Sequence, residues 1–196
     1  VTKDDCLDLP DKLYQKREID FSPEQKRIYE TLRKKAYVEL SKEKSITATL
    51  IITRLLRLHQ VLCGFVKHDD GTEESIPGVN PRLNELVHVL EETEGKVIIW
   101  ANYKSGKYKY IIANPRMGGY GITLTAAKTV IYYANTYDLE ARLQSEDRPH
   151  RIGQTSNVTY IDFVTPNTID EKIFSSLKNK KSLANSITGD NWTEWI

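Results

Sequence analysis

The chain has 196 residues, of which 39% are hydrophobic, so its length suits one compact domain with a real core. Its 28 basic and 27 acidic residues give a net charge of +1, which excludes a global field attracting nucleic acid or anionic membrane. Two cysteines are too few for a disulfide framework or a structural zinc site, and the longest apolar runs fall far short of the ~20 residues of a membrane span. We therefore expect an intracellular protein without a membrane segment, whose nucleic-acid contacts, if any, are local.

A helix is the first element that the sequence predicts clearly. Ser22 can cap it, Pro23 suits the first helical position, and Gln25 completes a capping box. Apolar residues then recur at helical spacing as far as Leu40. We predict a helix over this segment.

A second helix is predicted from about Ile46 to Leu62, with an apolar stripe that should pack against the first helix. His59 and Cys63 lie four residues apart on or just after it, but no second Cys/His pair follows at zinc spacing. We interpret Cys63 as a small core thiol and His59 as an ordinary histidine, in preference to a metal site. Residues 66–82 are rich in Gly, Pro, Asp and Asn, which predicts a loop.

Short apolar strands and amphipathic helices follow along the rest of the chain. Their order is helix, strand, strand, strand, helix, strand and helix, over residues 82–93, 96–103, 109–115, 129–135, 139–148, 157–166 and 168–187. Thr168 and Glu171 should form a capping box for the last helix, which should end at Gly189. The pattern predicts an α/β fold with an open, mostly parallel sheet covered by helices on both faces. Binding loops should lie beyond the carboxyl ends of its strands.

One junction does not fit a parallel sheet. The strands predicted at 96–103 and 109–115 are separated by very few residues, whereas a parallel crossover needs roughly a dozen or more. Either the two strands form an antiparallel hairpin with Ser105 and Gly106 at its turn, or a crossover segment is missing here.

Two stretches carry candidate phosphate chemistry, although the chain has no phosphate loop and no paired carboxylates that would hold magnesium. The first runs from Met117 to Ala127, where closely spaced glycines bare the backbone amides. A tight turn without a ligand explains that stretch equally well. We expect this chain to contact a phosphate without performing the whole reaction.

The second stretch is "QSEDRPHRIGQ", residues 144–154, where guanidinium groups can bind phosphate oxygens bidentately. Gln144, Arg148 and Arg151 fall at helical spacing, and Pro149 predicts that the helix ends or kinks there. The alternative is a surface helix end whose arginines pair with acidic neighbours, Glu146 and Asp147.

Residues 117–173 closely resemble the second RecA-like lobe of the Swi/Snf-type family, the ATP-dependent DNA translocases of helicase superfamily two. The specific signature Q-x-x-D-R-x-H-R-x-G-Q is matched at Gln144, Asp147, Arg148, His150, Arg151, Gly153 and Gln154. "VIIWANY" is similar to the family's fourth helicase motif, and "GGYGITLTAA" to its fifth. The resemblance extends from about Phe21 to Gly189. It departs from the family at the missing first lobe and at the short segment between the fourth and fifth motifs.

The resemblance implies a role for each matching residue. Arg148 and Arg151 would be arginine fingers, and Gln144, Asp147 and Gly121 would lie at the ATP. Gly118, Gly119 and Thr123 would contact the backbone of double-stranded DNA. We add Asn102 and Lys104 as candidates for the same contact, because they come just after the apolar run "VIIW" at 97–100. ATP and Mg²⁺ would be held mainly by the first RecA-like lobe, so this chain alone is predicted to be inactive.

The predicted organisation is an N-terminal strand and helical segment over 1–80, a RecA-like helicase C-terminal lobe over 81–190 with a crossover missing near 104–108, and a tail over 191–196. We expect a cytoplasmic protein of bacterial or phage source, or a nuclear one if the source is eukaryotic. Two alternatives remain open at this point. One is a non-catalytic lobe that binds nucleic acid or regulates a partner, and the other is the C-terminal half of a nucleotide-sugar glycosyltransferase.

Overall fold

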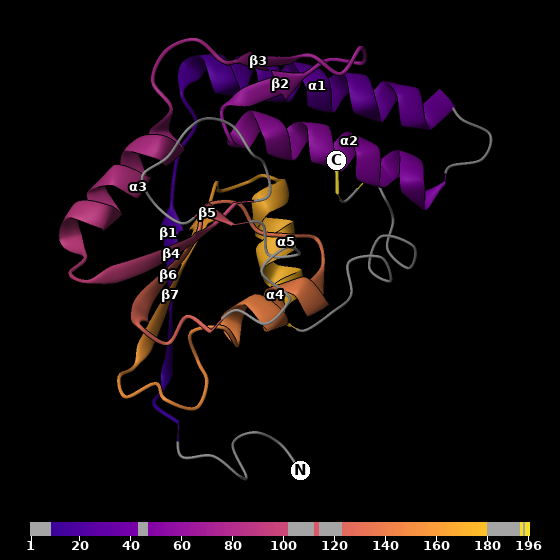
Figure 1. Ribbon diagram of the computed structural model, residues 1–196. Helices are drawn as coiled ribbons and strands as arrows, with labels where there is room; N and C mark the ends of the chain where they lie inside the picture. The colour runs from indigo at the N-terminus through magenta and orange to yellow at the C-terminus, as the bar shows by residue number, and fades with distance from the viewer. Residues whose placement is uncertain (1–8, 43–46, 102–111, 114–122, 180–192, 194) are drawn as a thin grey trace. The chain divides into compact units, whose positions relative to one another are not determined.

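The computed structural model describes residues 9–42, 47–101, 112–113, 123–179, 193 and 195–196 (Figure 1). Contacts divide the chain into two compact units. One comprises Val1–Arg17 and Val87–Phe163, and we call it the sheet unit; the other comprises Glu18–Leu86 and Val164–Ile196, and we call it the helical unit. The boundaries predicted from the sequence at 80 and 190 remain predictions.

The sheet has five strands in the order β1-β7-β6-β4-β5. Their bounds are Lys12–Glu18 for β1, Lys96–Trp100 for β4, Ile112–Ala113 for β5, Ala127–Tyr132 for β6 and Val158–Val164 for β7. The pairs β4–β5, β4–β6 and β6–β7 are parallel. β1 runs the same way, because Asp11 bonds to Val158 and Ile19 bonds to Val164. The predicted open parallel α/β sheet is therefore confirmed.

The direction of β5 resolves the junction that did not fit. Ile99 lies opposite Ile112 and Trp100 opposite Ala113 in parallel register. The hairpin alternative is wrong, because a two-residue turn would make the strands antiparallel. Ser105 and Gly106 lie outside the described residues.

The apolar strands of the sheet unit form its core. Ile98, Trp100, Val130, Tyr132 and Tyr160 are buried together, as expected for strands that are covered on both faces. β1 differs, because most of its side chains are exposed and several are charged. Charged side chains of this kind keep an edge strand from pairing with other chains.

The helical unit contains α1 (Pro23–Lys42), α2 (Ala48–Leu62) and α5 (Ile169–Lys178), and Figure 1 shows α1 and α2 side by side. The predicted capping box of α1 is confirmed: Gln25 N donates to Ser22 Oγ at 3.2 Å, and Ser22 N donates to Gln25 Oε1 at 3.1 Å. No helix in the described part of the chain is long and apolar enough to cross a bilayer.

The start of α5 differs in detail from the predicted capping box. Thr168 Oγ1 accepts from Asp170 N at 3.2 Å, as a cap does, but Glu171 accepts from the N–H of Asn167 at 2.9 Å, one residue before the cap. Asn167 has a φ of 58°, in the left-handed region, and this brings its N–H within reach. Gly189 lies outside the described residues.

The segment predicted as a loop at 66–82 contains secondary structure. β2 (Phe65–Lys67) and β3 (Glu73–Ser75) pair antiparallel, and α3 (Pro81–Glu92) begins directly afterwards. The hairpin turn closes with His68 N donating to Thr72 O at 2.9 Å, and Gly71 supplies a φ of 89°.

A buried charged cluster lies inside the helical unit. Asp170 of α5 pairs with Arg82, and His59 Nε2 lies 3.3 Å from its carboxylate. All three side chains are almost fully buried. Burial alone would raise the pKa of Asp170, but the Arg82 guanidinium and His59 outweigh it and lower that pKa to about 2. His59 is thus part of an ionic core cluster.

Candidate functional site

The predicted arginine stretch lies at the end of α4 (Leu139–Glu146) in the sheet unit. Asp138 caps this helix by accepting from Ala141 N at 3.1 Å. The helix ends at Glu146, because the ring of Pro149 disfavours a helical conformation in the residue before it. Residues 147–152, which we call the arginine turn, follow directly. The predicted end of the helix near Pro149 is confirmed.

Arg142 anchors α4 to the sheet. Its side chain is 5% exposed and donates from Nη2 to Asp162 of β7 at 3.1 Å and from Nε to Glu146 at 2.8 Å. The guanidinium also lies 3.4 Å from the ring centroid of Tyr132. No local pattern in the sequence singles out this residue. The available signal was Asp162, a charged residue in an otherwise apolar strand, which requires a buried partner.

Glu146 is the last residue of α4 and is 6% exposed. Besides Arg142, its carboxylate accepts from the Tyr14 hydroxyl at 2.9 Å and lies 3.5 Å from Lys12 Nζ. Its backbone carbonyl accepts from the Tyr160 hydroxyl at 2.7 Å. On α4, the carboxylate of Glu146 is bound by Arg142, whereas the alternative pairs it with the arginines of the turn.

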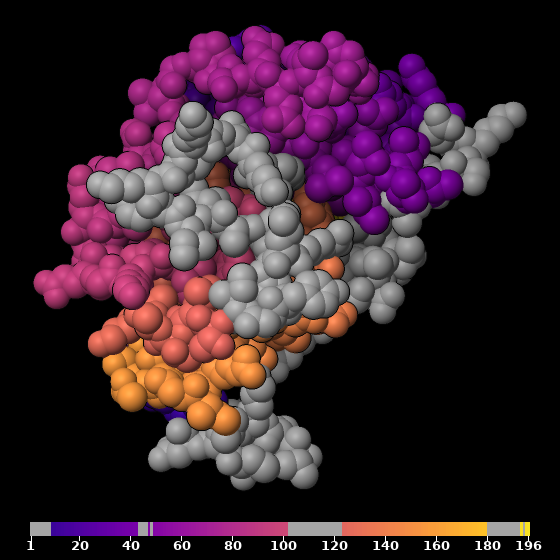
Figure 2. Space-filling model, viewed as in Figure 1, coloured from indigo at the N-terminus to yellow at the C-terminus, as the bar shows by residue number. Residues whose placement is uncertain are grey.

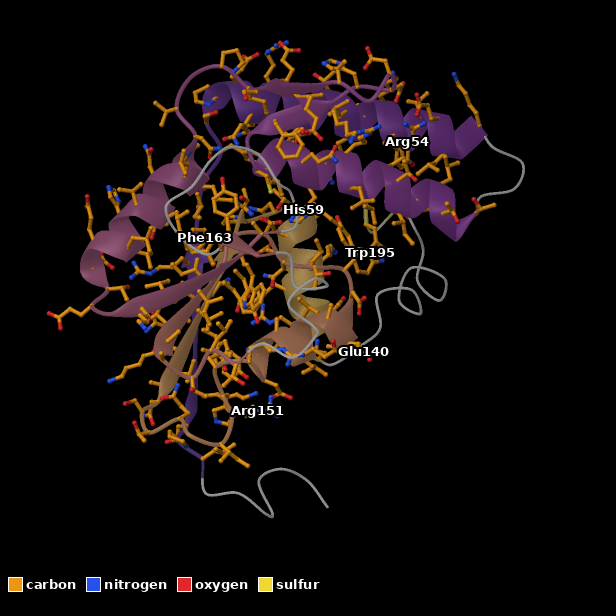
Figure 3. All side chains as sticks on the ribbon, viewed as in Figure 1. Arg54, His59, Glu140, Arg151, Phe163 and Trp195 are labelled. Carbon is orange, nitrogen blue, oxygen red and sulfur yellow. The ribbon has the colours of Figure 1, made fainter. Side chains whose placement is uncertain are left out.

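The arginine turn lines a hollow of about 310 Å³. The residues around it are Leu9, Gln144, Asp147, Arg148, His150, Arg151 and Ile152. Arg151 is exposed and lies at the opposite end of α4 from Glu140 (Figure 3), whereas Arg148 is half-buried. Gln144 is exposed and donates to Glu140 at 3.0 Å, and Asp147 lies 3.5 Å from Lys12. Gln144, Asp147, Arg148 and Arg151 are neighbours because they are close in the sequence. The structure adds that all four side chains line the same hollow.

Gln154 closes the arginine turn. Its buried amide donates to the carbonyls of Thr125, Ala127 and Pro149 at 3.0, 3.1 and 3.2 Å, and its oxygen accepts from the N–H groups that follow. Gly153 has a φ of 99°, a conformation that favours glycine. These two signature residues shape the backbone of the turn.

His150 ties the turn to the N-terminal segment. Its ring is 6% exposed, and Nε2 lies 2.6 Å from Pro10 O, so this nitrogen carries the proton and donates. This signature residue therefore binds the backbone of the segment that precedes β1.

The turn lies at the amino ends of β6 and β7. Leu124, just before β6, donates from its N–H to Arg148 O at 3.2 Å. Figure 2 shows the residues that begin near 123, in coral, beside those of the loop before β7, in orange. The arginine turn therefore lies at the opposite edge from the carboxyl ends of the strands, and the expectation that binding loops lie at those carboxyl ends stays a prediction.

Thr123 is exposed and precedes Leu124, so this candidate for DNA contact lies beside the arginine turn. The other candidates lie outside the described residues. These are Asn102, Lys104, Gly118, Gly119 and Gly121.

Comparison with protein families gives one match in the part of the chain that contains this site. Residues 85–153 match the helicase conserved C-terminal domain. The human lymphoid-specific helicase is 45% identical over 80 residues, covering 41% of this chain and 10% of that protein. The putative ATP-dependent helicase/translocase YwqA of Bacillus subtilis is 27% identical over 237 residues, covering 95% of this chain and 25% of that protein. The chain therefore spans at most a quarter of these relatives.

Solved structures share the fold. The C-terminal part of the Fun30 ATPase domain superposes with a TM-score of 0.68 at 14% identity, covering 93% of this chain and 100% of that one. The Sulfolobus solfataricus SWI2/SNF2 ATPase core in complex with dsDNA gives 0.62 at 23% identity, covering 95% of this chain and 48% of that one. At these identities the similarity establishes the fold alone.

Proposed function

We propose that this chain is the second motor lobe of an ATP-dependent translocase on double-stranded DNA. The premise is that the chain is a C-terminal lobe of helicase superfamily two, with relatives of the Swi2/Snf2 type. The observation that carries the proposal is the arginine turn. Four of its residues that match the signature, Asp147, Arg148, His150 and Arg151, line one hollow. His150 and the adjoining Gln154 are held by hydrogen bonds to backbone carbonyls. Every relative and structure named above is a helicase or an ATPase, which favours this function over a glycosyltransferase.

Arg148 and Arg151 are the proposed arginine fingers. ATP and Mg²⁺ would be held mainly by a first RecA-like lobe, and the guanidinium groups would stabilise charge on the transferred phosphoryl group. Gln144 and Asp147 line the same hollow and would hold the fingers in place, while Gly121 would contact the nucleotide. The chain's own contribution to hydrolysis is thus electrostatic, because it carries no phosphate loop.

Contact with the DNA backbone is assigned to the segments after β4 and before β6. Asn102 and Lys104 follow the β4 strand, and Gly118, Gly119 and Thr123 precede β6. Amides, a hydroxyl and one cation suit phosphate oxygens, which position a strand without reading its sequence. The exposed side chain of Thr123 supports this assignment.

A crossover segment is proposed to be missing near 104–108. β4 and β5 are parallel although few residues join them, and the alignment with YwqA spans 237 positions, more than the 196 residues of this chain. Since relatives come from a bacterium and from humans, we place the parent protein in a bacterial or phage-infected cytoplasm, or in a nucleus if its source is eukaryotic.

The test uses the full-length protein with Arg148→Ala or Arg151→Ala. Each substitution should lower DNA-stimulated ATP turnover by ~10³-fold or more, because a lost arginine finger costs that much in related phosphoryl transfers. The melting temperature and the affinity for DNA should stay near wild type. Arg27→Ala, which removes an exposed arginine from α1, is the matched control and should be neutral.

Near-normal turnover in both variants, together with a sharply lower melting temperature, would show a structural anchor in place of a catalytic pair. The 196-residue chain alone should show no turnover at all, since half of a two-lobe site lacks the groups that hold the phosphates.

A further inference from the structure

Residues 10–14, just before and at the start of the edge strand β1, contact the end of α4 and the arginine turn. Tyr14 donates its hydroxyl to Glu146 at 2.9 Å. Lys12 Nζ lies 3.5 Å from both the Glu146 and Asp147 carboxylates. Two residues before Lys12, the carbonyl of Pro10 accepts from His150 at 2.6 Å. Lys12 and Tyr14 lie two positions apart on the strand, so their side chains project from the same face.

Tyr14 is held where its hydroxyl reaches Glu146. Its ring stacks on Tyr160 with centroids 5.3 Å apart and an angle of 23° between the planes. Although Tyr14 is 57% exposed, burial and the Glu146 charge raise its pKa, so the hydroxyl remains a donor at any physiological pH.

The other oxygen of Glu146 is bound by Arg142, which is itself held by Asp162 of β7. A continuous chain of hydrogen bonds therefore runs from the sheet through α4 to the edge strand. Lys12, Tyr14 and Glu146 do not line the hollow beside Arg148 and Arg151.

We propose that Tyr14 and Lys12 of β1 are positioning residues for the arginine turn: by holding Glu146 and Asp147 they fix the backbone that presents Arg148 and Arg151 to ATP. The inference rests on the proposed function of those arginines. Glu146 is the last helical residue and directly precedes the turn. A displacement of ~1 Å at a catalytic group can cost ~10²-fold in rate.

The variants that test this are Tyr14→Phe, Lys12→Met and their combination, in the full-length protein. Tyr14→Phe keeps the stacked ring and removes one donor, while Lys12→Met keeps the aliphatic stem and removes the charge. Each single variant should lower kcat for DNA-stimulated ATP hydrolysis by roughly 3- to 10-fold, and the pair by roughly 30- to 100-fold, within the range that misplacement produces. KM for ATP, DNA affinity and the melting temperature should stay near wild type.

Matched controls come from side chains distant in the chain from the turn. Tyr37→Phe on α1 removes the hydroxyl of a half-exposed tyrosine, and Lys34→Met on the same helix removes an exposed cation. Both should leave kcat unchanged.

A double-mutant cycle separates positioning from a structural role. In a background in which both Arg148 and Arg151 are replaced by alanine, the Tyr14→Phe and Lys12→Met pair should add little further loss, because the groups that it positions are gone. A full additional loss, or a kcat loss that merely follows a lower melting temperature, would overturn the inference. So would wild-type kcat in the pair while Arg151→Ala is inactive. If Arg148→Ala and Arg151→Ala also keep normal turnover, the proposed function itself fails.

Discussion

Arg148 and Arg151 lie in different surroundings although they are three positions apart. Arg148 is half-buried and its carbonyl accepts from Leu124, while Arg151 is exposed on the turn. Arg151 therefore has room to reach a ligand outside this chain. A guanidinium presents a planar fork of donors to two phosphate oxygens, which the point charge of a lysine does not reproduce.

Arg151→Lys should consequently rescue poorly. We expect DNA-stimulated ATP turnover to stay within ~10-fold of the alanine variant, since the transition-state contact depends on the fork as well as on the charge. Steady-state hydrolysis by the full-length protein measures this, with Arg27→Lys on α1 as a neutral control. Turnover near wild type in Arg151→Lys would mean that a positive charge suffices at this position.

The sequence identified the arginines of the turn but not the residue that anchors them. Arg148 and Arg151 belong to a contiguous signature, so their relation is local in the chain. Arg142, on α4, is recognised only from its partners, and one of these, Asp162, lies 20 positions away on β7. Long-range pairing of this kind is not contained in any local pattern, although the charge inside an apolar strand signals that a partner exists.

At the scale of elements, the carboxylate of Asp170 links residues of three helices within the helical unit, α5, α3 and α2. The carboxylate lies at the start of α5, Arg82 lies at the start of α3, and His59 lies on α2. Removing one partner of a buried ion pair leaves the other charge uncompensated, which costs ~3 to 5 kcal/mol. The cluster should therefore make this unit sensitive to acid.

We expect the wild-type chain to lose roughly 2 to 3 kcal/mol of unfolding free energy from this carboxyl alone as the pH falls from about 4 through about 2. The folded pKa of about 2 lies below the ordinary value near ~3.9, so the contribution is complete above the higher value and is lost below the lower one. Urea unfolding at a series of pH values measures it.

Asp170→Asn should destabilise the chain by ~3 kcal/mol or more at neutral pH and flatten the acid profile. Asp69→Asn is a suitable control, because the Asp69 side chain is 97% exposed. An unchanged acid profile in Asp170→Asn would show that other carboxyl groups govern the acid transition.

Helix starts were predictable where their causes are local. The capping box of Ser22 and Gln25 is confirmed, because its partners lie three positions apart. The β2–β3 hairpin was missed, since strands of three residues are too short to show a period. The amino-end location of the arginine turn could not be read locally either, because it depends on the direction in which α4 runs back along the sheet.

The balance of charge over the whole molecule limits its affinity for DNA. With 28 basic and 27 acidic residues, binding rests on a few local contacts that release few counterions. DNA binding by this chain alone should be weak, lowered by salt and indifferent to sequence. Titration of unrelated duplexes across a series of salt concentrations tests this. Tight binding to one sequence with little salt dependence would indicate a different kind of module.

The pairing of β1 with β7 also determines how late in synthesis the sheet can form. Asp11 and Asn157, which meet at the start of this pair, lie 146 positions apart. During synthesis at ~5 to 20 residues per second, the first strand must therefore wait roughly 7 to 30 s before its partner leaves the ribosome. Until then β1 and β6 both lack the strand that lies between them, β7, so folding of the finished sheet should be slow for its size.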